Sequence, residues 1–230
     1  MRLVVISDIH ANYDALAAVL QKIRDFDYLV CLGDLVGYGP QPNEVVEQIR
    51  DLNLEVVIMG NHDYATVTAD TINFVTHAAR AIEWTRQTLK PENLHFLSKL
   101  PHYATKTLGE TVVASYHGSP RDPLNEYVYP GESQFMFQAL VEEAAAKLLL
   151  LGHTHIPFHS STPSGVVVNP GSIGQPRDGD ARSSYATIEI SNGNINCSIE
   201  RTSYDIESAA GKIVQKGLPT FLADRLFLGI

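Results

Sequence analysis

Short apolar runs alternate with amphipathic segments in the first quarter of the chain. The runs cover residues 3–6, 28–32 and 56–59 and are almost continuously apolar, as in strands buried on both faces of a sheet. Between them, residues 12–23 and 43–52 repeat apolar side chains at helical spacing, and Asn12 can cap the first of these helices. This alternation predicts a βαβαβ unit with parallel strands.

The pattern changes after this unit. Helical spacing dominates from about 69 to 100 and predicts a small helical excursion. A hairpin is expected over 103–115, and residues 118–131, which include three prolines, form a long loop of the kind that is usually functional. Further strands are expected at 147–151, 156–160, 165–168, 185–190 and 194–201, and further helices at 132–146 and 206–215. We expect one α/β domain over residues 1–230.

Composition and charge narrow the class of protein. The 230 residues carry a formal net charge of −9 without a basic stripe, which argues against binding to duplex nucleic acid. Cys31 and Cys197 lie far apart in sequence, as is typical of free thiols in a reducing cytoplasm. The first strand begins at residue 3 and leaves no room for a signal peptide, and no apolar run approaches the roughly 20 residues of a membrane span. We expect a cytoplasmic protein without membrane contact.

Polar side chains follow five of the predicted strands at the point where each strand ends. The clusters are Asp8-Ile9-His10, Leu32-Gly33-Asp34, Gly60-Asn61-His62-Asp63, Tyr116-His117-Gly118 and Gly152-His153-Thr154-His155. Strand ends in open α/β sheets are where ligands bind. These carboxylate, imidazole and amide groups, with no thiolate among them, suit Mn, Fe, Co, Ni or Zn. Asp34 can bridge two cations, and His153 and His155, two positions apart in an extended segment, can serve one cation each.

Each cluster taken alone has a structural explanation. Asp-x-His and Gly-Asp are common at caps and turns, and Gly-His-Thr-His is only moderately specific. Their occurrence together, each at a strand end, is hard to explain by structure alone, so we interpret the set as a metal site. Four other histidines match no cluster and are expected at the surface or partly packed: His77, His95, His102 and His159.

The five clusters, in this order, resemble the signature of the calcineurin-like metallophosphoesterase superfamily. All five blocks stand without substitution between residues 8 and 155. The downstream segments Asn169-Pro170-Gly171-Ser172, Ser119-Pro120-Arg121 and Gln175-Pro176-Arg177 resemble a bacterial and archaeal branch of single-domain phosphodiesterases. The resemblance therefore covers nearly the whole chain.

The resemblance implies a four-layer α-β-β-α sandwich of two mixed sheets and a dimetal site. It implies that the first metal is bound by Asp8, His10 and His155 and the second by Asn61, His117 and His153, with Asp34 as the bridge. A hydroxide that bridges the two ions would attack phosphorus in line. His62 would face the substrate as a general acid or phosphate donor, and Asp63 would support its loop.

One departure from the signature concerns the substrate. Protein phosphatases and symmetrical dinucleoside tetraphosphatases of the superfamily place an arginine shortly after Gly-Asp, where this chain has Tyr38. This argues against a protein phosphatase or a strict tetraphosphatase. Tyr38, Arg177 and Arg121 are the candidate substrate-binding residues, and either arginine supplies the missing cation to the substrate or lies at the surface. Tyr127 and Tyr129, in the long loop, either stack on a nucleobase or pack within the loop.

We therefore expect a dimetal phosphoesterase that hydrolyses phosphodiesters or nucleotide phosphoanhydrides. The alternatives are a phosphomonoesterase, including one that acts on phosphoserine, and a non-catalytic scaffold like the retromer subunit that resembles this fold without keeping a competent site. Retention of every ligand and of His62 favours the enzyme. The expected partner is a small phosphorylated substrate such as a nucleotide. The sequence leaves the native metal, among Mn, Fe, Ni, Co and Zn, and a homo-oligomeric state open.

Overall fold

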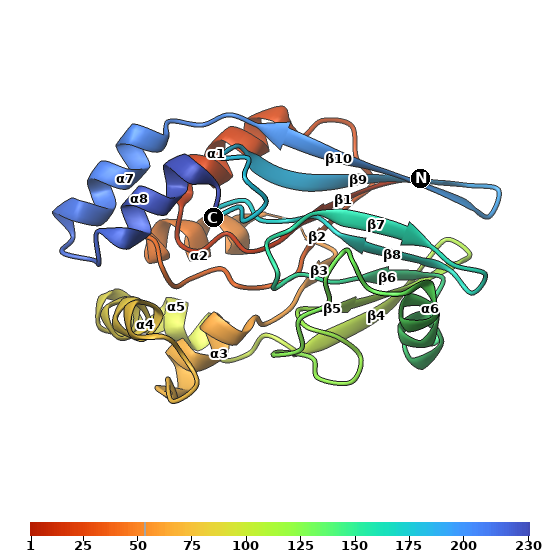
Figure 1. The fold of residues 1–230 in the computed structure, drawn as a ribbon, viewed down its shortest axis with the longest axis horizontal. Coiled ribbons are helices and arrows are strands. Elements are labelled where there is room, and N and C mark those ends of the chain that lie inside the picture. The colour runs from red at the N-terminus through yellow and green to blue at the C-terminus, as the bar shows by residue number, and fades with distance from the viewer. Residues whose placement is uncertain (53) are drawn as a thin grey trace.

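The computed structural model describes residues 1–52 and 54–230. Two five-stranded sheets form its centre, with the strand orders β10-β9-β1-β2-β3 and β4-β5-β6-β8-β7 (Figure 1). The strands are β1 (Arg2–Ile6), β2 (Tyr28–Cys31), β3 (Val56–Val57), β4 (Tyr103–Leu108), β5 (Thr111–Tyr116), β6 (Leu148–Leu150), β7 (Phe158–Ser161), β8 (Val166–Asn169), β9 (Ser183–Ser191) and β10 (Asn194–Thr202). The helices are α1 (Tyr13–Lys22), α2 (Pro42–Asp51), α3 (Asn61–Thr68), α4 (Thr76–Thr88), α5 (Pro91–Leu97), α6 (Gln134–Glu143), α7 (Ile206–Gln215) and α8 (Phe221–Leu228).

The first sheet contains the expected βαβαβ unit. β1 pairs with β2, and β2 with β3, in parallel, and α1 and α2 connect them. Asn12 caps α1 as expected, because its side chain accepts a hydrogen bond from the backbone N–H of Ala15 at 3.1 Å. β9 and β10 then add two antiparallel strands on the other side of β1. Parallel pairing brings the carboxyl ends of β1, β2 and β3 to one edge of the sheet.

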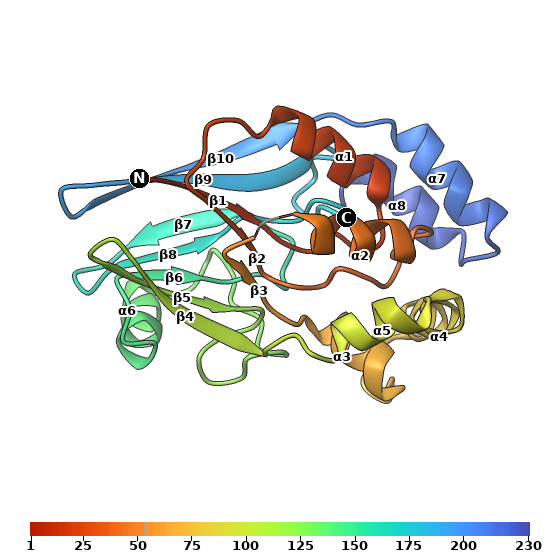
Figure 2. The ribbon, with the colours of Figure 1, turned by 180° about the vertical axis from the view of Figure 1, so that it is seen from behind.

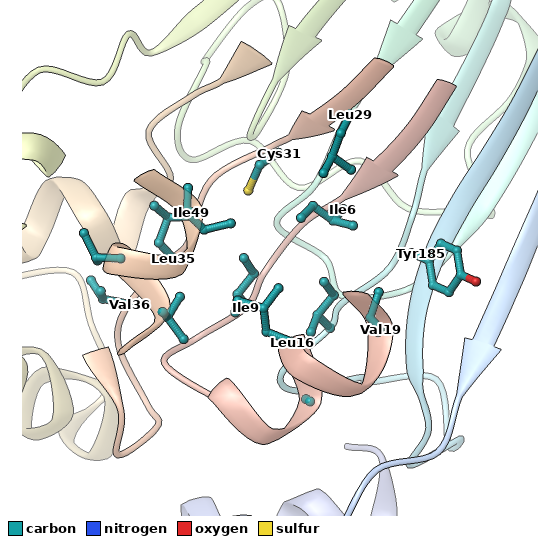
Figure 3. Close-up of a cluster of buried hydrophobic side chains, with 14 of the residues drawn as sticks. Ile6, Ile9, Leu16, Val19, Leu29, Cys31, Leu35, Val36, Ile49 and Tyr185 are labelled. Atoms are coloured by element: carbon teal, nitrogen blue, oxygen red, sulfur yellow. The ribbon is translucent and has the colours of Figure 1, made fainter. Parts of the chain in front are cut away.

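Three buried apolar clusters separate four layers of structure. The first joins Ile6 of the first sheet to Leu16 of α1 (Figure 3). The second lies between the two sheets and includes Val5 and Leu150. The third packs Phe137 of α6 against the outer face of the second sheet. These layers confirm the expected α-β-β-α sandwich of two mixed sheets.

The other helices gather at one end of the sandwich. In both views α3, α4, α5, α7 and α8 lie away from the β4–β5, β7–β8 and β9–β10 hairpins (Figures 1 and 2). A fourth apolar cluster joins Tyr38 to side chains of α4, α7 and α8. The carboxyl ends of the parallel strands are therefore framed by helices at this end of the molecule.

Some boundaries differ from the sequence prediction. Helix α3 begins at Asn61 rather than near 69, and its inward side carries His62 and Asp63, so hydrophobic periodicity does not reveal it. Residues 70–75 are not helical, and Ile72 there is 86% exposed. Helix α8 is absent from the prediction. None of the helices in residues 1–52 and 54–230 has the length and apolar character of a membrane span.

Candidate metal centre

The polar clusters of the sequence meet where strands of both sheets end. Asp8 and Asp34 follow β1 and β2 of the first sheet, whereas His117 and His153 follow β5 and β6 of the second. These four side chains are buried, at 4% exposure or less. Asn61, at the start of α3, is partly exposed. The second sheet thus brings two imidazoles to the carboxylates of the first.

The backbone is strained at the ligand positions themselves. Eleven non-glycine residues in the described part of the chain have positive φ. Seven of them lie at this site: Asp8, His10, Ala11, Asp34, Tyr38, His153 and His155. A left-handed conformation costs such a residue about 1–2 kcal/mol, and strain of this kind collects at functional sites. Gly60 adds to this local shaping, since a Cβ there would overlap the Asp34 carboxylate.

The candidate metal-ligating side chains form two groups that share one carboxylate. The first group is Asp8, His10, Asp34 and His155, and the second is Asp34, His117 and His153; in each, the candidate ligand atoms lie within 4.8 Å of one another. Oδ1 of Asn61 lies 3.0 Å from Nε2 of His117 and so adjoins the second group. The structure therefore brings all seven predicted ligands together, with Asp34 in the shared position.

The Nε2 atoms of two imidazoles in the first group face one another, an arrangement that a bound cation would stabilise. Burial lowers the pKa of His10 and of His155, so both rings are neutral at pH 7. Each ring donates its Nδ1–H to a backbone carbonyl, Val36 at 3.1 Å and Gln175 at 2.6 Å. Their Nε2 lone pairs then point toward each other across 3.0 Å. A bound cation turns this repulsion into coordination, and imidazoles oriented through their second nitrogen are typical of metal ligands.

Two buried polar atoms also favour a bound cation at this site. Oδ1 of Asp8 and Nε2 of His153 are buried and have no hydrogen-bond partner among the described residues. Such atoms are costly unless something binds them. The donor set is nitrogen and oxygen only, because Cys31 is a free thiol buried in the apolar layer against α1. The residues present therefore fit metal ions with N/O coordination.

His117 couples metal binding to pH. Burial disfavours its imidazolium, but the Asp34 carboxylate outweighs burial and raises the pKa of His117 to about 9. A cation at Nε2 must displace that proton, so affinity at the second group should fall roughly tenfold per unit as pH drops below this value. We expect calorimetric titration with Mn²⁺ at pH 8, in two buffers of different ionisation enthalpy, to show release of about one proton. Heats that do not differ between the buffers would contradict this.

Several buried side chains form hydrogen bonds to the backbone of the loops that carry the candidate ligands. Asp63 accepts a hydrogen bond from the backbone N–H of Gly60 (3.0 Å) within its own loop, and a second one from Val36 (3.1 Å) also ties the Asp34 loop to α3. Asn169 donates to the Gly152 carbonyl at 2.7 Å, and Ser172 donates to the Asp8 carbonyl at 2.7 Å. The sequence motif around Asn169 marks these residues, but nothing in it reveals which loops they support.

His62 belongs to neither metal group, although its ring centroid lies 4.8 Å from that of His10, and it borders a cavity. Its ring centroid lies 4.4 Å from that of Tyr38 and 4.9 Å from that of Phe74. All three side chains, with Tyr127, line a cavity of about 480 Å³ beside the second group. Burial lowers the pKa of His62 to about 4, so the ring is neutral at pH 7 and carries a single N–H.

The predicted substrate-binding residues occupy different surroundings. Arg177 donates from Nη2 to the Tyr38 hydroxyl at 3.3 Å, at the border of the site. Arg121 is instead paired with Glu126. The Tyr127 ring stacks on His153 with centroids 3.8 Å apart, and Tyr129 stacks in turn on Tyr127. The structure thus brings Arg177 and Tyr127 to the site and directs Arg121 to a carboxylate.

The four histidines outside the polar clusters lie at the surface or are partly packed, as expected. His95, His102 and His159 are exposed, and His77 is half-buried.

Comparison with known proteins agrees with this geometry. Residues 1–193 match the calcineurin-like phosphoesterase superfamily domain. Protein MJ0912 of Methanocaldococcus jannaschii, described as uncharacterised, is 39% identical over 244 residues, which cover 98% of this chain and 97% of that protein. A crystal structure of a metallophosphoesterase from Sphaerobacter thermophilus superposes with a TM-score of 0.85 at 34% identity and covers 100% of this chain and 99% of that one.

A shorter similarity concerns a nucleotide hydrolase. The symmetrical bis(5'-nucleosyl)-tetraphosphatase of Baumannia cicadellinicola is 44% identical over 63 residues, which cover 25% of this chain and 22% of that protein. The chain belongs to the calcineurin-like phosphoesterase superfamily and is a metal-dependent hydrolase of phosphoric esters.

Proposed function

We propose that the protein hydrolyses a phosphodiester or a nucleotide phosphoanhydride with two divalent ions, drawn from Mn, Fe, Co, Ni and Zn. Asp8, His10 and His155 would hold the first ion and Asn61, His117 and His153 the second, with Asp34 shared. Two such ions neutralise phosphate oxygens and lower the pKa of a water between them. The chain's own residues orient these ligands and shape the space in which the substrate lies.

The orientation of Asp34 carries this proposal. Its Oδ2 lies 3.4 Å from Nε2 of His10 and 3.4 Å from Nε2 of His117, one imidazole from each group. Its Oδ1 accepts the backbone N–H of His62 at 2.8 Å. One oxygen is thus held by the backbone while the other faces both groups, which is the arrangement that a bridging carboxylate needs.

His62 is the residue that we assign to the leaving group. It lines the cavity and lies outside both groups of candidate metal ligands. Because burial keeps the ring neutral at pH 7, it acts first as a hydrogen-bond donor to a phosphate or leaving oxygen. Negative charge on a bound phosphate favours the imidazolium, so proton transfer to the leaving oxygen can follow.

Aromatic walls favour a substrate that carries a base or another flat group. Tyr127 is 48% exposed and lines the cavity, and Phe74 contributes a second aromatic surface to it. Stacking on such rings is worth about 1–3 kcal/mol per base. The named activity of the tetraphosphatase relative supports a small nucleotide as the substrate class.

A substrate panel tests the proposal. We expect Mn²⁺-loaded protein to show higher kcat/KM for bis(p-nitrophenyl) phosphate or diadenosine tetraphosphate than for p-nitrophenyl phosphate or a phosphoserine peptide. An Asp8→Asn variant purified in parallel controls for a contaminating phosphatase. Preference for the monoester or the peptide would favour the phosphomonoesterase alternative. Bound metal without turnover of any of these substrates would favour a scaffold.

A further inference from the structure

Two arginines from distant parts of the chain converge on Tyr38. The guanidinium carbon of Arg177 lies 5.7 Å from the Tyr38 ring centroid, and that of Arg225 lies 6.0 Å from the same centroid. The Tyr38 ring in turn lies 4.7 Å from the His10 ring and 4.4 Å from the His62 ring. Both cations are therefore one aromatic ring away from the candidate metal centre.

Helix α8 delivers Arg225 to this place. Leu222 and Leu226 pack on Tyr38 in the fourth apolar cluster, which sets the face that α8 turns inward. The helix ends at Leu228 and is capped by Gly229. The Gly229 carbonyl accepts the backbone N–H of Gly179 at 2.9 Å, and Gly179 lies two residues beyond Arg177. Gly229 has φ +64°, and a Cβ there would overlap Asp180. The end of α8 is thus fastened to the loop that carries Arg177 (Figure 1).

Neither cation forms an ion pair with an acidic side chain in residues 1–52 and 54–230. The arginine ion pairs in the described part of the chain belong to Arg121, Arg182 and Arg201. Arg177 donates from Nη2 to Tyr38 and to Oε1 of Gln175, while its Nε is buried without a partner. Arg225 donates from Nε to the Ile230 carbonyl. Burial, and after it the charge of Arg177, lower the pKa of Arg225 to about 10.

We propose that Arg177 and Arg225 bind a second phosphate group of the substrate, next to the phosphate held at the metal centre. This inference rests on the proposed function and narrows it to substrates with linked phosphates, such as nucleoside di- and triphosphates or dinucleoside polyphosphates. Two guanidinium groups that lie against one ring without an acidic partner among the described residues can both pair with an anion, and guanidinium groups suit phosphate oxygens. A simple diester has no second phosphate for this site. Arg225 lies outside residues 1–193, the part that matches the superfamily domain.

Paired substrates test the assignment. We expect Arg225→Gln and Arg177→Gln to lower kcat/KM for diadenosine tetraphosphate about tenfold or more beyond any loss on bis(p-nitrophenyl) phosphate, mainly through KM, since bonds to a charged group are lost. Arg225→Lys keeps the positive charge and most of the aliphatic part of the side chain, so it should recover part of the lost kcat/KM for diadenosine tetraphosphate. Arg80→Gln, at an exposed arginine on α4, removes the same charge and should change neither substrate. Melting temperatures identify any variant that fails to fold.

A binding measurement separates this inference from the proposed function. Inorganic tripolyphosphate should inhibit diester hydrolysis more strongly than inorganic phosphate does. Arg225→Gln should weaken the inhibition by tripolyphosphate but not that by phosphate, and Arg225→Lys should weaken it less than Arg225→Gln does. The second-phosphate site is wrong if the arginine variants lose kcat/KM equally on both substrates, or if they are inhibited by tripolyphosphate as strongly as the wild type is. Diester hydrolysis by the wild type, and so the proposed function, would stand in either case. Failure of the wild-type protein to hydrolyse any phosphoester would overturn the proposed function instead; calorimetric binding of tripolyphosphate to wild-type and Arg225→Lys protein would still decide the second-phosphate site.

Discussion

Asp34→Asn is expected to bind fewer than two Mn²⁺ ions per chain and to lose about 10³-fold or more in turnover, since metal stabilisation of transition-state charge is worth several kcal/mol. The substitution preserves the size of the side chain but removes the charge that lies between His10 and His117. An amide oxygen carries no negative charge, so it binds two cations far more weakly than the carboxylate Oδ2 that faces both groups. Elemental analysis of the Mn²⁺-loaded wild type should approach two ions, and the variant should fall toward one.

The control for this experiment is an acidic residue outside the site. Asp25 is exposed and its replacement, Asp25→Asn, changes the net charge by the same amount. Metal content and turnover of this variant should equal those of the wild type. The bridging role of Asp34 is wrong if the wild type saturates near one ion and Asp34→Asn binds the same amount.

His62→Ala is expected to keep both ions and to lose roughly 10²–10⁴-fold in turnover, the usual contribution of a positioned acid or donor. The contact that orients Asp34 comes from the backbone N–H of His62, which alanine retains. Metal binding should therefore survive while the donor to the leaving oxygen is lost. The loss should be smaller for p-nitrophenol, a good leaving group that needs little protonation, than for an alcohol. Elemental analysis and turnover on one substrate of each kind measure this.

His153→Ala is the matched comparison. His153 has a buried, unpartnered Nε2 beside Asp34 and His117, so its removal should lower metal affinity together with activity. Equal metal loss in the two variants would make His62 a ligand. Full activity of His62→Ala on the poor leaving group would exclude it as the donor.

Strand ends were predictable because the physical signal is local. A buried parallel strand needs continuous apolar side chains, so the change to Asp, His or Asn after Ile6, Leu32 and Leu151 marks where each strand leaves the core. The ligand types are equally local, since carboxylate and imidazole define the coordination chemistry wherever they lie. Helix α8 carried a signal as well, with Leu222 and Leu226 four residues apart and a glycine just beyond its end.

Other features depend on contacts between distant segments. Helix α3 is missed because its inward side chains are those of the site, which breaks the apolar periodicity. Arg121 and Arg177 stand in similar polar segments of the sequence, yet one meets Glu126 and the other Tyr38. The hydrogen bonds of Asn169 and Ser172 to the ligand loops likewise depend on how β8 and the following turn lie beside them.

The sequence by itself determined the parallel βαβαβ unit, the superfamily resemblance and the seven ligand types, because burial, helical spacing and donor chemistry are properties of short segments. Tertiary structure alone decided that one carboxylate faces both imidazole groups, that the His10 and His155 lone pairs oppose each other, and that Arg177 and Arg225 both lie against the Tyr38 ring. The reason is that coordination and electrostatic coupling act over a few ångströms. Residues more than a hundred positions apart reach that range only when the two sheets and α8 have packed.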